Sequence, residues 1–366
     1  MTRRAVRIAY LAHGIGGRLT GVHAKILTQA STWAALAPEV EAGIFVRCEA
    51  GTEGDWIGRP HVVAVRSSRF GIAGRLVARE LLSLAVARWR PDLIYLRQST
   101  VSPSVVGLMS RVPTIVELNT LDLVELRLRS PLRYLYARPV RDRMLRRAVG
   151  LVVVTNEIAR NATVARLGVP IAVVPNGIDL QSISASRPPG NANPHLVFVG
   201  TPGLPWHGVD KVGVLAALFP SWTFDLVGPD SNELPRLPAN VIVHGSLDRA
   251  GLAPILAAAD VAIGPLALHR KKMNEAASLK VADYLAHGLP AMIAGADTRF
   301  PHGAPFLLEL PNVEDNIHPS AGAIEAFVTS WMGRRVERAD IVSIDASAVE
   351  RARLDFILAT LARHDG

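Results

Sequence analysis

Short runs of Val, Ile and Leu alternate with helix-length amphipathic stretches along the whole chain. Such short, continuous apolar runs are typical of strands that are buried on both faces of a parallel sheet. The first half predicts strands at Val6–Ala12, Gly43–Val46, Val62–Val65, Leu93–Leu96, Thr114–Glu117, Leu151–Val154 and Ala172–Val174. Helices are predicted between them at Val22–Leu36, Ala73–Arg88 and Asn156–Arg166. This alternation predicts a doubly wound α/β domain that closes near Pro175–Asp179.

The same alternation restarts after residues 181–194, whose Ser, Pro, Asn and Gly predict a linker. The second half predicts strands at Leu196–Val199, Thr223–Val227, Val241–His244, Val261–Ile263 and Pro290–Ile293, and helices at Val209–Phe219 and Ala250–Ala258. A last helix is expected at about Ala348–Arg363, within residues 347–366, with Ser347 as its N-cap. This helix could pack on either half. The predicted fold class is α/β, with Rossmann-like domains at residues 1–180 and 195–346 and a ligand cleft between them.

Length and cysteine content narrow the class of protein. At 366 residues the chain is long enough for two domains that each bury a core. Its single cysteine, Cys48, excludes an internal disulfide framework and favours a cytoplasmic location. The apolar run Val6–Ala12 is too short for a signal peptide core or a membrane span, and no other run reaches about 18 residues. We therefore expect no membrane-spanning segment.

The net charge of +8 is unevenly spread along the chain. Residues 1–180 contain 25 Lys and Arg against 13 Asp and Glu, a net +12, whereas residues 181–366 contain 15 against 19, a net −4. Eight arginines lie between Arg127 and Arg147, interleaved with apolar side chains. They predict a basic amphipathic helical segment that is broken near Pro139.

Three interpretations of this arginine-rich segment stay open from the residues alone. A basic amphipathic surface favours anionic lipid headgroups or a polyphosphate ligand, and it would place the protein on the inner face of the cell membrane. Nucleic acid is the weaker alternative, because no zinc finger, helix-turn-helix or aromatic stacking motif accompanies the charge. A solvated arginine face without a binding role fits the same pattern.

A glycine-rich loop follows the first predicted strand and opens a helix. In His13–Gly21, Gly16 and Gly17 let backbone N–H groups approach an anion, and Arg18 adds a positive charge. The spacing departs from Gly-x-Gly-x-x-Gly, and no acidic residue ends the second strand as nicotinamide dinucleotides require. The loop therefore predicts a phosphate contact and disfavours a dinucleotide cofactor.

A second loop, Gly200–Lys211, leaves the first strand of the second half in the same way. It could be a plain strand-to-helix turn. However, Trp206 and His207 at a loop tip favour ligand contact over packing, although a lone histidine is more often structural.

Residues 269–293 combine charged groups with a helix start, a Gly-Leu-Pro stop and an apolar strand. We expect Glu275 at the mouth of the helix and Asp283 two turns further in, with Lys280 between them. Eight helical positions offset the two carboxylates by about 80°, so both could reach one crevice. This arrangement suits a charged ligand at a helix N-terminus, and a surface helix with ordinary charges is the alternative.

Three ordered segments carry a family resemblance: Val174–Asp179 (Val-Pro-Asn-Gly-Ile-Asp), Phe198–Asp210 (Phe-Val-Gly, then Trp-His-Gly-Val-Asp) and Glu275–Pro290. Their order and spacing resemble retaining GT-B glycosyltransferases, and among these family 4. The resemblance covers nearly the whole chain. The family's Glu-x7-Glu hallmark becomes Glu275 and Asp283 here.

The resemblance implies separate roles for these residues. Glu275 would lie beside the donor sugar and stabilise the positive charge that develops at the anomeric carbon. Asp283 would bind the ribose hydroxyls of a nucleotide. Lys280, with the N–H groups of Ala276–Leu279, would face the diphosphate as its charge increases. No metal and no cofactor is implied beyond the nucleoside diphosphate sugar, because a helix N-terminus and basic side chains can stabilise the leaving group.

The chain departs from the family at two places. Many relatives place Arg and Lys in the loop after Phe-Val-Gly, where this chain has Thr201 and His207. Many also carry a His after the strand that ends near Glu117, where Asn119 stands here and cannot act as a base. A same-face transfer, in which the departing phosphate oxygen takes the acceptor's proton, needs no such base. The predicted donor-binding residues are Gly16, Gly17, Arg18, Gly200, Thr201, His207, Arg270, Lys272, Ser278, Leu279, Lys280 and Asp283; Glu275 is the predicted catalytic residue and Asn119 the predicted acceptor contact.

We therefore expect a metal-independent glycosyltransferase that moves a hexosyl or related sugar to a glycan or lipid-linked acceptor of the cell envelope or an exopolysaccharide. The acceptor would bind the basic first half, which would lean on an anionic membrane. The alternatives are a nucleotide-sugar epimerase or phosphorylase of similar architecture and a catalytically silent sugar-nucleotide-binding subunit. A periplasmic sugar-binding protein is disfavoured by the missing signal peptide.

Overall fold

The computed structural model describes residues 4–13, 21–48, 62–66, 71–98, 102–230, 234 and 236–365, and the chain divides into two compact units. The first unit consists of residues 1–177 together with 346–366, and the second of residues 178–345. The predicted linker at 181–194 lies within the second unit, and the predicted last helix lies within the first. None of the described helices is long and apolar enough to span a bilayer.

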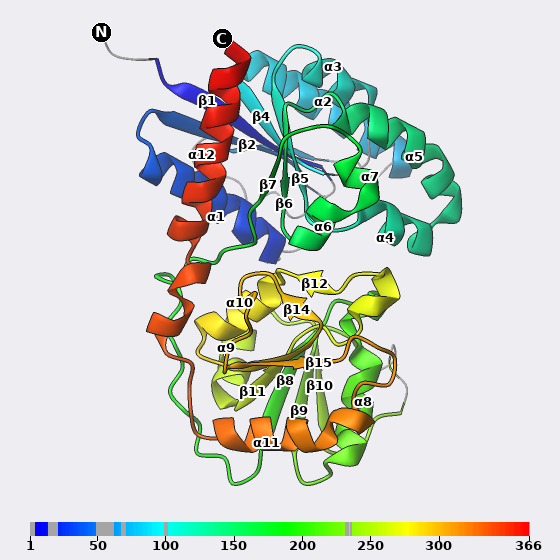
Figure 1. The fold of residues 1–366 in the computed structure, drawn as a ribbon, viewed down its shortest axis with the longest axis vertical. Coiled ribbons are helices and arrows are strands. Elements are labelled where there is room, and N and C mark those ends of the chain that lie inside the picture. Colours follow the sequence, from blue (N-terminus) through cyan, green and yellow to red (C-terminus); the bar gives the residue numbers. More distant parts are fainter. Residues whose placement is uncertain are drawn as a thin grey trace. The chain divides into compact units, whose positions relative to one another are not determined.

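The first unit is built on a parallel sheet with the strand order β3-β2-β1-β4-β5-β6-β7 (Figure 1). The strands are β1 (Val6–Ala12), β2 (Val40–Cys48), β3 (Val62–Arg66), β4 (Leu93–Arg97), β5 (Thr114–Leu118), β6 (Gly150–Val153) and β7 (Ile171–Val173). All seven overlap the predicted strands. The order reverses between β1 and β4, and doubly wound sheets bind ligands at the carboxyl edge beside such a reversal.

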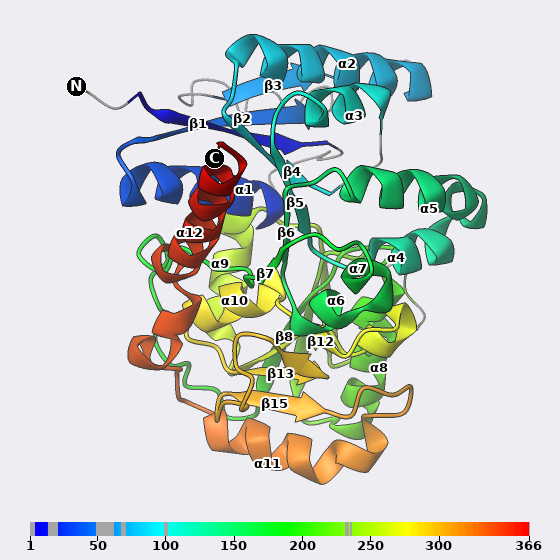
Figure 2. The same cartoon turned by 45° about the horizontal axis from the view of Figure 1, so that its top comes forward.

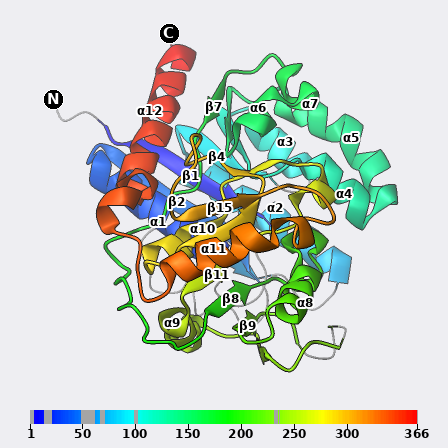
Figure 3. The ribbon, with the colours of Figure 1, turned by 60° about the horizontal axis from the view of Figure 1, so that its bottom comes forward.

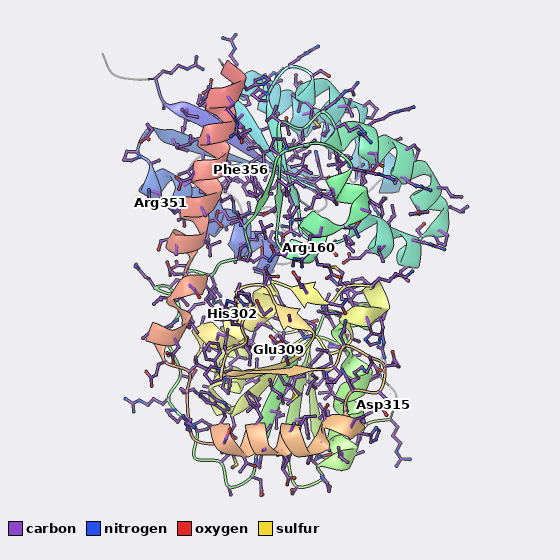
Figure 4. All side chains as sticks on the ribbon, in the orientation of Figure 1. Arg160, His302, Glu309, Asp315, Arg351 and Phe356 are labelled. Carbon is purple, nitrogen blue, oxygen red and sulfur yellow. The ribbon has the colours of Figure 1, made fainter. Side chains whose placement is uncertain are left out.

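One face of this sheet is covered by α1 (Gly21–Leu36) and α12 (Ala346–Asp365), which lie side by side (Figure 1). Trp33 of α1 and Ile357 of α12 share a fully buried core with Tyr10. Phe356 of α12 lies against Gly150 so closely that a Cβ there would lie 3.0 Å from its ring (Figure 4). Because α12 already begins at Ala346, Ser347 lies in the first turn and is not the predicted N-cap.

The opposite face carries α2 (Gly71–Trp89), which packs against β2 and β3 and lies beside α3 (Pro103–Met109) (Figure 2). Strand alternation explains the division. Ile8, Tyr10 and Ala12 point toward α1 and α12, so the intervening residues of β1 point toward α2.

Two predicted helices are each interrupted. The arginine-rich segment forms α4 (Asp122–Arg129) and α5 (Pro131–Leu145), and the break lies at Ser130, not at Pro139, which is inside α5. Ser130 precedes a proline, and that position disfavours helical backbone. The predicted helix at 156–166 is split into α6 (Asn156–Arg160) and α7 (Ala162–Ala165), because Asn161 is extended and its side chain caps α7.

The second unit repeats the same kind of sheet, in the order β10-β9-β8-β11-β13-β15. Its strands are β8 (His195–Val199), β9 (Thr223–Val227), β10 (Val241–Gly245), β11 (Val261–Ile263), β13 (Ala291–Ala294) and β15 (Leu307–Leu310). A separate short pair joins β12 (Glu275–Ala276) to β14 (Ala296–Asp297). The reversal of order lies between β8 and β11, so β8 corresponds to β1 of the first unit.

Helices cover both faces of this second sheet. α8 (Val209–Leu218) and α9 (Arg249–Ala258) lie on either side of β8 and β9 (Figure 3). α10 (Leu279–Ala286) contributes to the core that contains α9, whereas α11 (Ala321–Trp331) contributes to the core that contains α8. The described residues of this unit also form short 3-10 helices: η2 (Pro205–His207), η4 (Leu268–Lys271), η5 (His318–Ser320) and η6 (Arg338–Ile344).

Candidate functional site

Three of the predicted donor-binding residues meet at the carboxyl end of β8. The Nζ of Lys280, in the first turn of α10, donates to the carbonyl of Val199 at 2.8 Å and to Nδ1 of His207 at 3.2 Å. The backbone N–H of Thr201 donates to the same Nδ1 at 3.1 Å. The structure therefore joins the loop after β8 to the N-terminus of α10 through one imidazole.

Burial and nearby positive charge keep His207 neutral and disfavour the charged form of Lys280. Burial, followed by the charges of Lys280 and Lys271, lowers the pKa of His207 to about 3, which agrees with an Nδ1 that only accepts. Burial and Lys271 also lower the pKa of Lys280 to about 7. Within the described part of the chain, no carboxylate is among the groups that shift the pKa of Lys280. An anionic ligand would supply the counter-charge that this ammonium group lacks there.

Two glycines allow this loop to close over β8. A Cβ on Gly200 would lie 2.6 Å from the ring of Phe198, so no other residue fits without movement. Gly208 adopts a left-handed φ of 74° between η2 and α8, and a Cβ there would crowd Leu266. The glycines thus set the backbone path that brings His207 back to the end of the strand.

Arg270 is held by carboxylates of its own unit. Its guanidinium donates to both oxygens of Asp210, at 2.8 and 2.7 Å, and pairs with Glu314. These contacts fix η4 against α8 and the segment after β15, and they occupy the guanidinium of a residue predicted to bind the sugar nucleotide. Lys271 lies over the Trp206 ring at 5.5 Å. Lys272 is exposed, with a left-handed φ of 55°.

Glu275 does not lie on a helix, and the predicted 80° offset from Asp283 on one helix is wrong. Glu275 is in β12, where it pairs with Ala296 of β14. The carbonyls of Asn274 and Ala276 accept hydrogen bonds from Ala296 and Thr298, at 2.8 and 3.1 Å. Because these backbone groups are used in a strand ladder, the helix begins only after Ser278, at Leu279.

Asp283 lies in the middle of α10 and is half-buried. Its carboxylate is 3.7 Å from Nδ1 of His287, one helical turn later. Burial raises the pKa of Asp283, and the charges of His287 and Arg249 oppose that rise. Arg249, the first residue of α9, is therefore near enough to act on the predicted ribose-binding group.

A buried ion pair that sequence reasoning missed supports the N-terminus of α10. Arg299 donates to Asp297 and to the carbonyl of Ser278 at 3.1 Å, and both charged side chains are almost fully buried. Asp297 and Ser278 also line a small cavity with Ala276. The sequence contains one signal of this ion pair, because an acidic and a basic residue stand two positions apart after a predicted strand.

In the first unit, the amide of Asn119 is locked at both ends. Its Oδ1 accepts from Nζ of Lys25 at 2.8 Å, and its Nδ2 donates to Glu117 at 2.9 Å. Glu117 is fully buried and also pairs with Lys25, Arg97 and Arg353. The predicted acceptor contact is thus part of a charged network at the carboxyl end of β5.

The three cations decide the ionisation of this network. Burial alone would raise the pKa of Glu117, but Lys25, Arg353 and Arg97 hold it well below its usual range. Burial lowers the pKa of Lys25 to about 7 despite the attraction of Glu117. Sequence reasoning missed Lys25, Arg97 and Arg353 because they come from three separate elements.

The arginine-rich segment presents leucines outward as well as arginines. On α4 and α5, Leu128, Leu132 and Leu135 are 55%, 83% and 70% exposed. Arg141, in contrast, is buried and pairs with Asp122 and Asp142. The predicted Gly16, Gly17 and Arg18 lie outside the described residues.

Residues 21–182 match the model of Glycosyltransferase Family 4. No curated protein sequence matches the chain. Among solved structures, it is similar to the apo form of the lipopolysaccharide outer core galactosyltransferase WaaB, with a TM-score of 0.66, 13% identity and coverage of 97% of this chain and 99% of that one. It is similar to sucrose-phosphate synthase from Thermosynechococcus elongatus, with a TM-score of 0.66, 15% identity and coverage of 98% and 97%.

The chain is also similar to Anabaena HepE, solved in complex with UDP and glucose, with a TM-score of 0.63, 17% identity and coverage of 97% of this chain and 100% of that one. These likenesses extend over both units. Together, the matches show that the chain has the GT-B fold and that its residues 21–182 resemble glycosyltransferase family 4.

Proposed function

We propose that this chain is a retaining, metal-independent glycosyltransferase whose second unit binds a nucleoside diphosphate sugar. The observation that carries this proposal is the cluster of Lys280, His207 and Thr201 at the carboxyl end of β8. A desolvated lysine at the start of a helix, whose described hydrogen bonds go to a carbonyl and a neutral imidazole, suits a diphosphate. The UDP and glucose bound by HepE make UDP-glucose the first donor to test.

In this mechanism the bond between the anomeric carbon and the diphosphate breaks as the acceptor hydroxyl approaches on the same face. The negative charge that grows on the departing phosphate is stabilised by Lys280 and the N–H groups at the start of α10. That phosphate oxygen takes the acceptor's proton, so Asn119 need not act as a base. Glu275 would stabilise the sugar cation, and Asp283 would bind the ribose.

The acceptor is a glycan or lipid-linked glycan of the cell envelope or an exopolysaccharide, bound by the first unit. Exposed Leu128, Leu132 and Leu135 among arginines support contact with an anionic membrane. Sedimentation with vesicles that contain anionic lipid should pull down the protein, and the double substitution of Leu132 and Leu135 to Ser should weaken this. Val77→Ser, at an exposed apolar site of α2, is the matched control; equal binding to neutral vesicles would refute the membrane contact.

The proposed function is tested by thermal stabilisation with a panel of nucleoside diphosphate sugars, followed by turnover of the donor that binds. Glu275→Ala should reduce turnover by about 100-fold or more while donor binding persists. Glu325→Ala, on the exposed side of α11, should leave turnover unchanged. Failure of every donor to bind would reject the proposal.

A catalytically silent sugar-nucleotide-binding subunit is the second candidate. It is favoured by Thr201 and the neutral His207, which stand where many relatives carry a cationic pair. In that case a donor would bind, but the unmodified protein would show no turnover with any acceptor.

A further inference from the structure

A second polar cluster lies at the carboxyl end of β1 and β2. Ala12, the last residue of β1, pairs with Val46 of β2. The register therefore brings the next residues, His13 just after β1 and Arg47 of β2, beside each other, about 4.8 Å apart at the backbone. By strand alternation both point to the face that α2 covers, away from α1 and α12. Both side chains are buried, with His13 only 5% exposed.

The polar atoms of this cluster lack partners. Within the described residues, neither ring nitrogen of His13 has a hydrogen-bond partner. The same holds for Nε of Arg79 and for Oγ of Ser83, which lies one turn after Arg79 on α2. Buried polar groups are nearly always satisfied, so four such atoms from β1 and α2 indicate that a ligand completes the cluster.

Among the described residues, the charges that act on His13 all have the same sign. Burial, then Arg79 and Arg47, lowers the pKa of His13 to about 3. Burial, then Arg47 and Arg75, lowers the pKa of Arg79. Across the described ranges, no Asp or Glu is among the groups that shift either pKa. The Glu117 network, at the same edge of the same sheet, contains its own carboxylates, whereas the described charges that act on His13 and Arg79 are all positive.

We propose that His13, Arg79 and Ser83, with Arg47 beside them, bind a phosphoryl group. The guanidinium offers paired N–H donors, the neutral imidazole one N–H and the hydroxyl another, which suits the several oxygens of a phosphate. The site lies beside the reversal between β1 and β4, where such sheets bind ligands. This assignment rests on the proposed function. The site would bind an acceptor that carries a phosphate ester or a lipid-linked diphosphate.

Calorimetric titration with inorganic phosphate, glucose 1-phosphate and a short-chain prenyl diphosphate tests this site. The unmodified protein should bind at least one of them, and the tightest ligand identifies the source of the phosphate. Arg79→Gln should weaken that binding about tenfold or more, and His13→Gln should also weaken it. Arg88→Gln, at an exposed position of the same helix, should stay within about twofold. No binding of any of the three, or equal losses for Arg79→Gln and Arg88→Gln, would overturn the assignment.

Thermal unfolding separates a ligand site from a structural one. Arg79 is partly buried beside other cations, and such like-charge contacts destabilise the fold. Arg79→Gln should therefore unfold at the same or a higher temperature than the unmodified protein in phosphate-free buffer. It should also lose the stabilisation by phosphate. A large fall in unfolding temperature would show a structural arginine and overturn the proposal; His13→Gln supplies the binding test if Arg79→Gln does not fold.

The donor site provides the internal reference. Stabilisation by the nucleoside diphosphate sugar should be unchanged in Arg79→Gln. If no donor binds but Arg79→Gln still abolishes phosphate binding, the proposed transferase function fails and the phosphate site stands. If donor and acceptor turn over but Arg79→Gln leaves the KM of a phosphorylated acceptor unchanged, the acceptor assignment fails.

Discussion

Lys25 in the first unit and Lys280 in the second are two lysines with the same shifted pKa in different surroundings. Burial lowers the pKa of each to about 7. Lys25 donates to the carboxylate of Glu117 and to Asn119, both at 2.8 Å. Lys280 donates to a backbone carbonyl and to a neutral His207.

The difference lies in where the counter-charge comes from. Glu117 is part of the fold and serves Lys25, Arg97 and Arg353 together, so its loss should affect stability. For Lys280 the proposed counter-charge is a ligand diphosphate, so its loss should affect binding. A lowered lysine pKa therefore has no single meaning, and the partner decides whether the group is structural or functional.

The largest effect is expected for Glu117, the counter-charge of Lys25, and it is an effect on stability. Glu117→Gln removes the negative charge that Lys25, Arg353 and the partly buried Arg97 share, and it should lower the free energy of unfolding by about 3–5 kcal/mol. Urea unfolding measures this, with Glu39→Gln at an exposed site of the same unit as the control. A loss below about 1 kcal/mol would show that Glu117 does not hold the network together.

The functional lysine should respond in the opposite way. Lys280→Gln should weaken binding of a nucleoside diphosphate sugar by about 1.5–3 kcal/mol, roughly 10- to 100-fold, without reducing stability. Arg236→Gln, at an exposed position of the same unit, should change affinity less than about twofold. If Lys280→Gln destabilises the protein as Glu117→Gln does, the two lysines have the same structural role.

The pH dependence sharpens the contrast further. Only the charged form of Lys280 attracts the diphosphate, and with a pKa of about 7 it loses its proton as pH rises through neutrality. Donor affinity should therefore fall about tenfold between pH 6 and pH 8. A nucleoside diphosphate sugar is the suitable probe, because its phosphodiester groups do not titrate in this range. In Lys280→Gln the donor affinity should not change with pH. If the donor affinity of the unmodified protein is also independent of pH, the proposed role of Lys280 is wrong.

The smallest effect is expected at Arg270, whose donors go to the exposed carboxylates of Asp210 and Glu314. Arg270→Gln should cost less than about 1 kcal/mol of stability, because exposed ion pairs contribute little. Donor affinity, measured by calorimetric titration with the nucleoside diphosphate sugar, should stay within about twofold of that of the unmodified protein. A tenfold loss would return Arg270 to the diphosphate site where the sequence had placed it.

The sequence predicted the strands well because buried parallel strands are short, apolar and separated by helices. The prediction from sequence was wrong where a capping side chain, a proline or a strand pairing overrode the local hydrophobic pattern. Ser130 and Asn161 break predicted helices through backbone and capping effects. Glu275 leaves the helix because β12 pairs with β14, where Glu275 lies opposite Ala296. Periodicity cannot indicate a contact with a residue so much later in the chain.

The site residues show the same limit. Gly200, Thr201, His207 and Lys280 could be named because they follow a strand or open a helix, and the structure brings Thr201, His207 and Lys280 together. The Glu117 network could not be named, because Arg353 lies 236 residues from Glu117. Their pairing depends on the return of α12 to the first sheet.

The return of α12 to the first sheet also affects the order in which the two units fold during translation. The ribosome makes α12 only after the whole of the second unit, yet Arg353 on α12 supplies part of the counter-charge of Glu117, and Glu350 accepts from Trp33 of α1. Until then, the first sheet has its strands, but one of its faces carries α1 without the neighbouring α12. The second unit is thus free to finish folding first, and the first unit, although translated earlier, becomes complete last.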